Sequence, residues 1–239
     1  MPKAYLEPEE VEQLEEAGQY LRDKLLIRLL FRLGCRISEA LGIAVSDIDF
    51  DQGTVTIEHL KVRLNLSCPD CGTRLSKAAR FCPGCGTKVE KAVIQEREYP
   101  RKRTLPIDPD TLEMIRDYID RGGPVSHNGK QLLFGISRRR AWQIIRDCAK
   151  RAGLGDLVNP ETGRMHHVSP HKLRDALAIM AVKKDDSGDG LRLLQEHLGH
   201  QNINTTMKYR KVAGKEHKEW YGKIWSEEDA RTSDSSDKR

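Results

Sequence analysis

Two arginines, two histidines and one tyrosine stand at spacings that would let them act together on a phosphodiester. They fall in three separate segments, at Arg36, at His171 and Arg174, and at His200 and Tyr209. A tyrosine hydroxyl can attack phosphorus and hold the broken strand as a phosphotyrosine, which conserves the bond energy for religation. Two guanidinium groups can bind the non-bridging oxygens as negative charge builds up on them. The set therefore predicts phosphoryl transfer to tyrosine without a metal.

Each of these residues alone also has a purely structural interpretation. Arg36 follows an apolar helical stretch and could simply pair with Glu39 at i+3, which is worth roughly a few tenths of a kcal/mol. His200 comes after Gly199, a typical helix-ending residue, where a histidine often only complements the helix dipole. The ordered set as a whole favours catalysis over these separate explanations.

Three motifs in this set resemble those of the tyrosine recombinases, the family of phage-type integrases and Xer-type chromosome-dimer resolvases. They read Gly34-x-Arg36-x-Ser38-Glu39-x-Leu41, His171-x-x-Arg174, and Leu198-Gly199-His200 followed after eight residues by Tyr209. The likeness extends over roughly Tyr5 to Trp225. It implies a mainly helical α+β fold, the tyrosine-recombinase catalytic fold, with a small antiparallel sheet. It also implies site-specific recombination or integration of double-stranded DNA through a 3′-phosphotyrosine.

The resemblance assigns a role to each residue of the motifs. Tyr209 is the expected nucleophile, His171 is a candidate to manage its proton, and Glu39 is a supporting residue that orients the cluster. The groups expected to hold the pentacoordinate phosphorus are Arg36, Arg174 and His200.

The resemblance also implies a general acid, because the leaving 5′-oxygen needs a proton. In the family this acid is a lysine on the hairpin of the small sheet. Lys61 is the first candidate because it follows the first expected strand, and Lys102, beside the returning strand, is the alternative. No catalytic metal is expected.

Four cysteines form a second pattern, Cys68-x-x-Cys71-Gly and Cys82-x-x-Cys85-Gly. Each pair can place two thiolates on a tight turn, and the glycine permits the positive φ that such a turn needs. The two pairs predict a closed structural Zn²⁺ site, in preference to disulfides or a redox pair. The remaining thiols, Cys35 and Cys148, lie in apolar helical contexts and are expected in the core.

Positive charge is concentrated around these cysteines. The 239-residue chain carries a net charge of +5, yet residues 61–103 alone hold eleven Lys or Arg against four Asp or Glu. Such a segment is typical of phosphate contact, although a solvated charged loop is the alternative. The side chains expected to bind DNA are Arg101, Arg103, Arg138, Arg139 and Arg140. The sequence has no signal peptide and no apolar run near eighteen residues, which predicts a cytoplasmic, nucleoid-associated protein.

Local signals place these motifs on elements. Pro8, Pro109 and Pro170 open helices, Ser137 caps another, and Gly199 ends one. Further helices are expected over 23–33, from 38, over 191–197 and over 202–208, the last leading to the nucleophile. Strands are expected over 54–57 and 103–107. The expected organisation is a catalytic domain over 1–225, a zinc ribbon inserted over 64–90 and a disordered polar tail over 226–239.

One departure from the family leaves several functions open. Family members normally carry an N-terminal helical DNA clamp, and this chain starts almost directly at the catalytic domain. A partner protein could supply the clamp, or the ribbon could add grip on DNA. Self-association on DNA is expected, with C-terminal aromatic residues either docking on a neighbouring protomer or packing on their own domain. The alternatives to a recombinase are a type IB topoisomerase-like nicking and closing enzyme and a zinc-ribbon DNA-binding regulator with a vestigial site.

Overall fold

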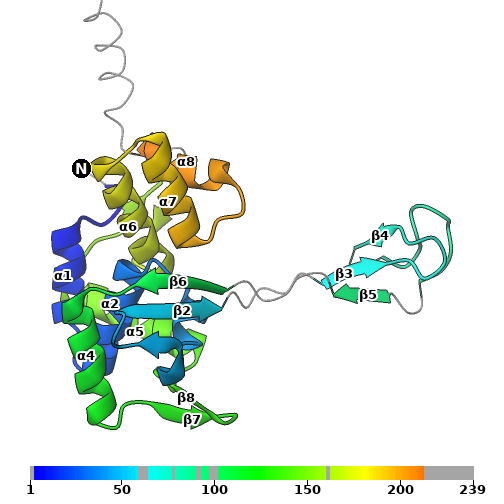
Figure 1. The fold of residues 1–239 in the computed structure, drawn as a ribbon. Helices are drawn as coiled ribbons and strands as arrows, with labels where there is room; N and C mark the ends of the chain where they lie inside the picture. Colours follow the sequence, from blue (N-terminus) through cyan, green and yellow to red (C-terminus); the bar gives the residue numbers. More distant parts are fainter. Residues whose placement is uncertain are drawn as a thin grey trace, which may run out of the picture.

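The computed structural model describes residues 3–58, 64–76, 79–89, 93–96, 102–159 and 162–212. Lys61, Arg101 and the C-terminal aromatic segment lie outside these residues. The described chain forms a helical body with a small three-stranded sheet, together with a separate small sheet within residues 64–96 (Figure 1). The mainly helical α+β fold predicted from the sequence is confirmed.

The N-terminal part supplies the centre of the core. It consists of α1 (Pro8–Glu16), α2 (Leu21–Arg32) and α3 (Ile37–Leu41). Helix α2 contacts helices on several sides, so Leu25, Leu26, Ile27, Leu29 and Leu30 are almost entirely buried. It begins at Leu21, two residues before the start predicted from the sequence.

The three-stranded sheet has the order β1-β2-β6 and is antiparallel throughout. Its strands are β1 (Ile48–Asp49), β2 (Thr54–Glu58) and β6 (Lys102–Pro106). Ile57 lies opposite Arg103, and Glu58 lies opposite Lys102. Each predicted strand therefore exists within one residue of its expected bounds. Because the chain leaves this hairpin at residue 58 and returns at residue 102, the cysteines belong to an insertion between two paired strands.

Two helices after the sheet begin at the predicted caps. The helix α4 (Pro109–Asp120) has Asp108 as its N-cap, whose Oδ1 accepts from Thr111 N at 3.1 Å. The helix α5 (Arg138–Arg151) has Ser137, whose Oγ accepts from Arg140 N at 3.2 Å. Two short hairpins were not predicted, because their strands are mostly exposed and lack a clear apolar alternation. They are β7 (Val125–His127) with β8 (Lys130–Leu132), and β9 (Leu157–Val158) with β10 (Met165–His166).

The C-terminal helices are α6 (Pro170–Lys184), α7 (Gly188–Leu198) and α8 (Ile203–Val212). Helix α6 packs against α2 and also contacts α7 and α8, so it joins the two halves of the body. Helix α7 begins earlier than predicted because Ser187 Oγ accepts from Gly190 N at 3.0 Å. Tyr209 lies inside α8, whereas the helix predicted from the sequence ends at residue 208.

The inserted sheet has the order β4-β3-β5, with strands β3 (Leu64–Ser67), β4 (Arg74–Leu75) and β5 (Val93–Glu96). Its small core contains Cys68, Leu75 and Cys82. The paired strands extend six residues beyond the expected boundary at residue 90. Among all described residues, no helix is long and apolar enough to cross a membrane.

Candidate active site and metal centre

The first part of the site is a buried carboxylate that holds two arginines. Gly34 turns the chain at the end of α2 with φ +55°, and Arg36 becomes the N-cap of α3. The Glu39 carboxylate, 2% exposed, accepts from the Arg36 backbone N at 2.9 Å and from Arg36 Nη1 at 2.8 Å. Arg103 Nη2 on β6 donates to the same carboxylate at 2.8 Å. Two positive charges thus satisfy a carboxylate that would be costly to bury alone.

Arg174 forms the centre of the site. Its side chain, on the first turns of α6, is buried and donates to the carbonyl oxygens of Gly34 and Leu198, the latter at 2.7 Å. Burial, and then the positive charge of Arg36, lowers the pKa of Arg174. A guanidinium nevertheless remains protonated at neutral pH. The residue therefore presents a fixed positive charge at the point where α2 and α7 end.

His200 is fixed by contacts with both of its ring nitrogens. Arg174 Nη2 lies 2.9 Å from Nε2, and Thr206 Oγ1 lies 2.9 Å from Nδ1. Because a guanidinium can only donate, we infer that Nε2 accepts and that Nδ1 carries the hydrogen. Burial, followed by the charge of Arg174, lowers the pKa of His200 to about 4. The imidazole is therefore neutral at pH 7.

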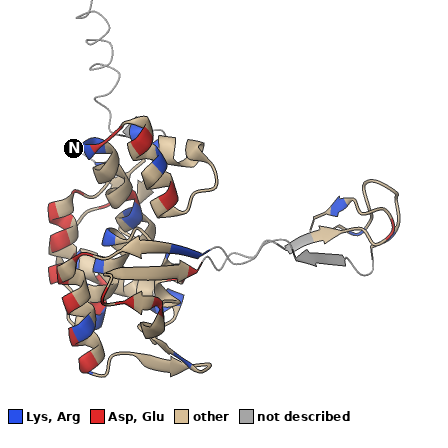
Figure 2. Ribbon diagram, viewed as in Figure 1, with Lys and Arg blue, Asp and Glu red and all other residues tan. Residues whose placement is uncertain are grey.

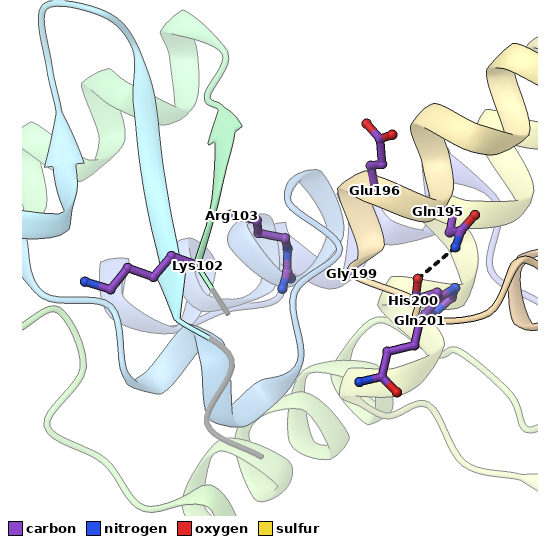
Figure 3. Close-up of a pocket in the computed structure, with 7 residues that line it drawn as sticks. All are labelled: Lys102, Arg103, Gln195, Glu196, Gly199, His200 and Gln201. Atoms are coloured by element: carbon purple, nitrogen blue, oxygen red, sulfur yellow. Dashed lines mark hydrogen bonds between the residues drawn. The ribbon is translucent and has the colours of Figure 1, made fainter. Parts of the chain in front are cut away.

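The backbone around His200 depends on a left-handed glycine. Gly199 ends α7 with φ +67°, and His200 N then donates to Gln195 O at 3.0 Å. The Gln195 side chain returns a bond to the His200 carbonyl oxygen at 3.0 Å (Figure 3). A Cβ on Gly199 would come within 2.9 Å of Arg103 Nη1, so this position also lets the strand arginine approach the helix end.

Tyr209 reaches the same place from α8. Its ring lies nearly parallel to that of His200, with centroids 6.2 Å apart. Its hydroxyl donates to Asp175 Oδ1 at 3.1 Å. Burial raises the pKa of Tyr209, and the charge of Asp175 raises it further, while the Arg174 guanidinium acts in the opposite direction. The phenol is therefore protonated before reaction.

His171 lies on the same face of α6 as Arg174 and Asp175, but the Tyr209 hydroxyl donates to Asp175 and not to His171. It lies one turn before Asp175 on α6 and is exposed as a whole residue. Partial burial of the imidazole ring lowers the pKa of His171. The charge of Asp175 raises this pKa, and the charges of Arg174 and other nearby arginines lower it again. Its assignment to the tyrosine proton stays a prediction.

A pocket of about 180 Å³ opens between β6 and the end of α7. Its lining residues are Lys102, Arg103, Gln195, Glu196, Gly199, His200 and Gln201 (Figure 3). In Figure 3 the Arg103 side chain points toward Gly199, whereas the Lys102 side chain points away from His200. Because neighbouring residues of a strand leave it on opposite faces, the two side chains line the pocket from different sides of β6.

The expected DNA-binding arginines differ in their surroundings. Residues Arg138, Arg139 and Arg140 are exposed on the first turn of α5, where they are free to meet a phosphate backbone. The side chain of Arg103 is only 14% exposed and is held by Glu39. Acidic residues gather instead along α1 and α4, with basic residues at the free end of β6 (Figure 2). DNA contact by these arginines stays a prediction, but Arg103 also has a structural partner that the sequence did not reveal.

The four cysteine sulfurs lie close together in the turns beside the strands of the inserted sheet. Their sulfur atoms all lie within 4.8 Å of one another, with Cys68 Sγ 3.7 Å from Cys85 Sγ and Cys71 Sγ 3.4 Å from Cys82 Sγ. Tetrahedral Zn²⁺ with Zn–S bonds of about 2.3 Å places its sulfurs about 3.8 Å apart. The four thiols therefore fit a metal ion of this kind.

The two halves of the cysteine cluster repeat each other. In each half the backbone N–H of the first cysteine donates to the carbonyl oxygen of the threonine five residues later, at 2.9 Å for Thr73 and 2.8 Å for Thr87. The glycine after the second cysteine is left-handed, with φ +71° at Gly72 and +75° at Gly86. The hydroxyls of the same threonines lower the pKa of Cys71 and of Cys85. These hydroxyls favour the thiolate, the form that binds a metal, at Cys71 and Cys85, whereas the pKa of Cys68 is raised to about 11 when no metal is bound.

Comparison with known proteins identifies the class to which this fold belongs. A crystal structure of XerA recombinase superimposes with a TM-score of 0.59 at 19% identity, covering 94% of this chain and 66% of that one. The catalytic domain of bacteriophage HP1 integrase gives a TM-score of 0.52 at 17% identity, covering 90% of this chain and 92% of that one. The fold is therefore that of tyrosine recombinase catalytic domains.

Sequence matches give the family. Residues 4–69 and 68–216 match the phage integrase family, so the chain belongs to that family of tyrosine recombinases and integrases. Tyrosine recombinase XerD of Neisseria meningitidis serogroup B is 29% identical over 201 residues, which cover 81% of this chain and 51% of that protein. Tyrosine recombinase XerA of Pyrococcus furiosus is 27% identical over 230 residues, which cover 92% and 60%. The chain thus spans between about half and three fifths of these relatives.

Sequence reasoning missed three residues that shape the site: Asp175, Arg103 in its pairing with Glu39, and Thr206. Asp175 directly follows the His171-x-x-Arg174 motif, and an acidic residue there was a visible signal. The contact of Asp175 with Tyr209 depends on how α8 packs against α6, and this packing cannot be read from the sequence.

Proposed function

We propose that this chain is the catalytic part of a site-specific DNA recombinase or integrase that works through a 3′-phosphotyrosine. One observation carries the proposal: the Tyr209 ring, on α8, lies against the pair formed by Arg174 on α6 and His200 after α7. Three elements of one chain thus bring a nucleophile, a fixed cation and a histidine together in the order expected for the family.

The phosphodiester would bind between Arg174 and Arg36, whose guanidinium groups offset the charge that develops on the non-bridging oxygens. Its negative charge would raise the pKa of His200, so that in the complex Nε2 can donate to a phosphoryl oxygen. Thr206 holds the opposite ring nitrogen and keeps the imidazole in that orientation.

In the first step the Oη–P bond to Tyr209 forms and the P–O5′ bond breaks. The phenol loses its proton, and the leaving 5′-oxygen gains one from a lysine. Lys61 is our first candidate for this acid and Lys102 the second. The orientation of Lys102, away from His200, supports Lys61. Attack by a 5′-hydroxyl on the phosphotyrosine reverses the step and rejoins the strand.

The test is a trapped adduct. Nicked duplexes cut from the DNA that flanks this gene would be incubated with protein in EDTA, and covalent complexes would be resolved on denaturing gels. Tyr209→Phe should abolish the adduct and leave DNA binding nearly unchanged. Tyr20→Phe, at a tyrosine that is 62% exposed on another part of the body, is the matched control and should retain the adduct. An adduct that persists in Tyr209→Phe would show that the nucleophile is another residue.

Two further assays, strand exchange and supercoil relaxation, separate recombination from simple nicking and closing. Strand exchange between two duplexes that carry the site would support the recombinase, whereas relaxation of supercoils by the monomer would support the type IB-like alternative. A structure of lambda integrase is described as a dimer bound to a COC′ core site, and one of XerH as bound to a palindromic difH substrate. We therefore propose that this chain also binds double-stranded DNA and self-associates on it.

We further propose that the four cysteines hold a structural Zn²⁺ and that the inserted sheet adds affinity for DNA. The sulfur geometry supports the first statement, and the basic composition of residues 61–103 supports the second. A variant that joins residues 61 and 101 by a short turn should bind DNA more weakly and with a flatter salt dependence. Unchanged affinity and salt slope would point instead to a protein partner for the insertion.

A further inference from the structure

The acceptor of the Tyr209 hydroxyl hydrogen in this structure is Asp175. The distance from Oη to Oδ1 is 3.1 Å, and the two residues come from helices α8 and α6, which pack together. Asp175 is next to Arg174 in sequence, so the acceptor of the proton and a cation for the phosphate come from consecutive residues. The positive charge of the Arg174 guanidinium acts on the same hydroxyl and lowers the pKa of Tyr209, against the larger effects of burial and of Asp175.

Attack on phosphorus requires that the phenol lose its proton as the Oη–P bond forms. His200 is poorly placed to receive it, because Thr206 holds Nδ1 and Nε2 faces Arg174 here and already carries a proton in the complex proposed above. His171, the candidate from the sequence, is not the hydrogen-bond partner of the hydroxyl, which donates to Asp175. The phenol hydrogen is already directed at a carboxylate, and proton transfer along an existing hydrogen bond needs no rearrangement.

We propose that Asp175 is the general base for Tyr209 in strand cleavage and the general acid that returns the proton in religation. As the Oη–P bond forms, the phenol proton passes to Asp175 Oδ1, and the carboxylate becomes a neutral acid. The P–O5′ bond breaks, and the lysine acid protonates the 5′-oxygen. In religation the 5′-hydroxyl attacks phosphorus and returns its proton to the neutral lysine as the P–O5′ bond forms; the Oη–P bond breaks, and Asp175 protonates the leaving phenolate.

A carboxylate near a phosphodiester would repel it unless nearby cations offset its charge. Lys172 Nζ lies 3.5 Å from Asp175 Oδ2, on the oxygen that does not face Tyr209. Arg174 is the residue directly before Asp175 in the sequence. These two cations offset the negative charge of the carboxylate, while its other oxygen remains directed at the phenol.

The test rests on the proposed function and uses the same nicked duplexes under single-turnover conditions with the full chain. Asp175→Asn should slow adduct formation by about 10²–10⁴-fold, the range for loss of a general base, with DNA affinity unchanged. Asp175→Glu, which keeps a carboxylate, should retain part of the rate. Asp186→Asn, at an exposed carboxylate that pairs with Arg210 at 3.2 Å, is the matched control and should cleave as the wild type does.

A second measurement distinguishes a base from a residue that only positions the phenol. Replacing Tyr209 with a fluorinated tyrosine makes the phenol more acidic and reduces its need for a base. In the Asp175→Asn background this replacement should recover at least tenfold of the lost rate. If the rate stays low in both forms, Asp175 acts only by packing. If Asp175→Asn cleaves as fast as the wild type or faster, Asp175 is at most a resting-state latch. Either result overturns the proposal.

Failure of the proposed function looks different. If the wild type forms no adduct, or if Tyr209→Phe forms one, the phosphotyrosine mechanism and the role of Asp175 fall together. If the wild type forms an adduct that requires Tyr209 but not Asp175, only the inference about the base is wrong.

Discussion

Replacing Glu39 with glutamine should destabilise the whole body, because the carboxylate neutralises two arginines in a buried place. Glutamine keeps the shape but loses the charge, and its amide NH₂ would face a guanidinium donor. Removing one partner of a buried ion pair costs about 3–5 kcal/mol. Since the Arg36 side chain is 30% exposed and partly solvated, we take the lower end, about 3 kcal/mol.

For a domain of this size, about 1 kcal/mol shifts Tm by roughly 2–4 °C, so Glu39→Gln should lower Tm by about 6–12 °C. The measurement is thermal unfolding at pH 7 followed by circular dichroism. Asp117→Asn is the matched control, since Asp117 Oδ1 pairs with Arg121 Nε at 2.7 Å while both side chains are exposed. Loss of such an exposed pair costs only about 0–1 kcal/mol.

The reasoning is refuted if Glu39→Gln and Asp117→Asn have the same Tm within the error of measurement. A double variant sharpens the test. Arg103→Met in the Glu39→Gln background removes one of the two uncompensated charges, so the combined loss should be smaller than the sum of the single losses. Strict additivity would mean that Glu39 and Arg103 do not interact, contrary to the 2.8 Å contact between them.

Further predictions concern the phosphate site, the histidine and the zinc. Arg36→Ala should slow cleavage about 10²–10³-fold, as for loss of one oxyanion donor, and Arg174→Lys should be comparably impaired and less stable, because an ammonium cannot replace the planar fork. Folding lowers the pKa of His200 from the usual 6.5 to about 4. The unfolded chain therefore binds the proton first, and the free energy of unfolding falls as the pH drops from 6.5 toward 4. Unfolding curves should show that His200→Gln loses less of this free energy than the wild type between pH 6.5 and 4.5. Replacing Cys68 and Cys71 with serine should release zinc, measured by elemental analysis, and unfold the insertion while leaving the unfolding of the body unchanged.

Local chemistry explains which parts of the fold could be predicted from the sequence. The starts of α1, α4 and α5 and the end of α7 follow from Pro8, Asp108, Ser137 and Gly199, whose backbone preferences act over a few residues. The cysteine cluster was equally predictable, since Cys-x-x-Cys-Gly fixes two ligands within a single turn. The β7–β8 hairpin was not, because its alternate residues are exposed and leave no apolar pattern to detect.

Contacts between distant segments explain what the sequence could not show. Arg103 is 64 residues from Glu39, and its pairing depends on the register that places it opposite Ile57. In the sequence, Arg103 is therefore indistinguishable from the other basic residues of 61–103, and its pairing with Glu39 could not be predicted. The contact between Asp175 and Tyr209 likewise depends on how α8 packs on α6, which local propensity does not determine.

The burial of Arg174 shows why the catalytic motifs are spread along the chain. The side chain donates to the carbonyl oxygens of Gly34 and Leu198, which lie where α2 and α7 end. A helix C-terminus carries partial negative charge and unpaired carbonyl oxygens, so two such ends stabilise a cation that burial alone would disfavour. Gly34 and Gly199 follow or form these ends, and each adopts positive φ. The glycines of the first and third motifs thus shape the two helix ends whose carbonyl oxygens bind the arginine of the second motif, and this cation is in place before DNA binds.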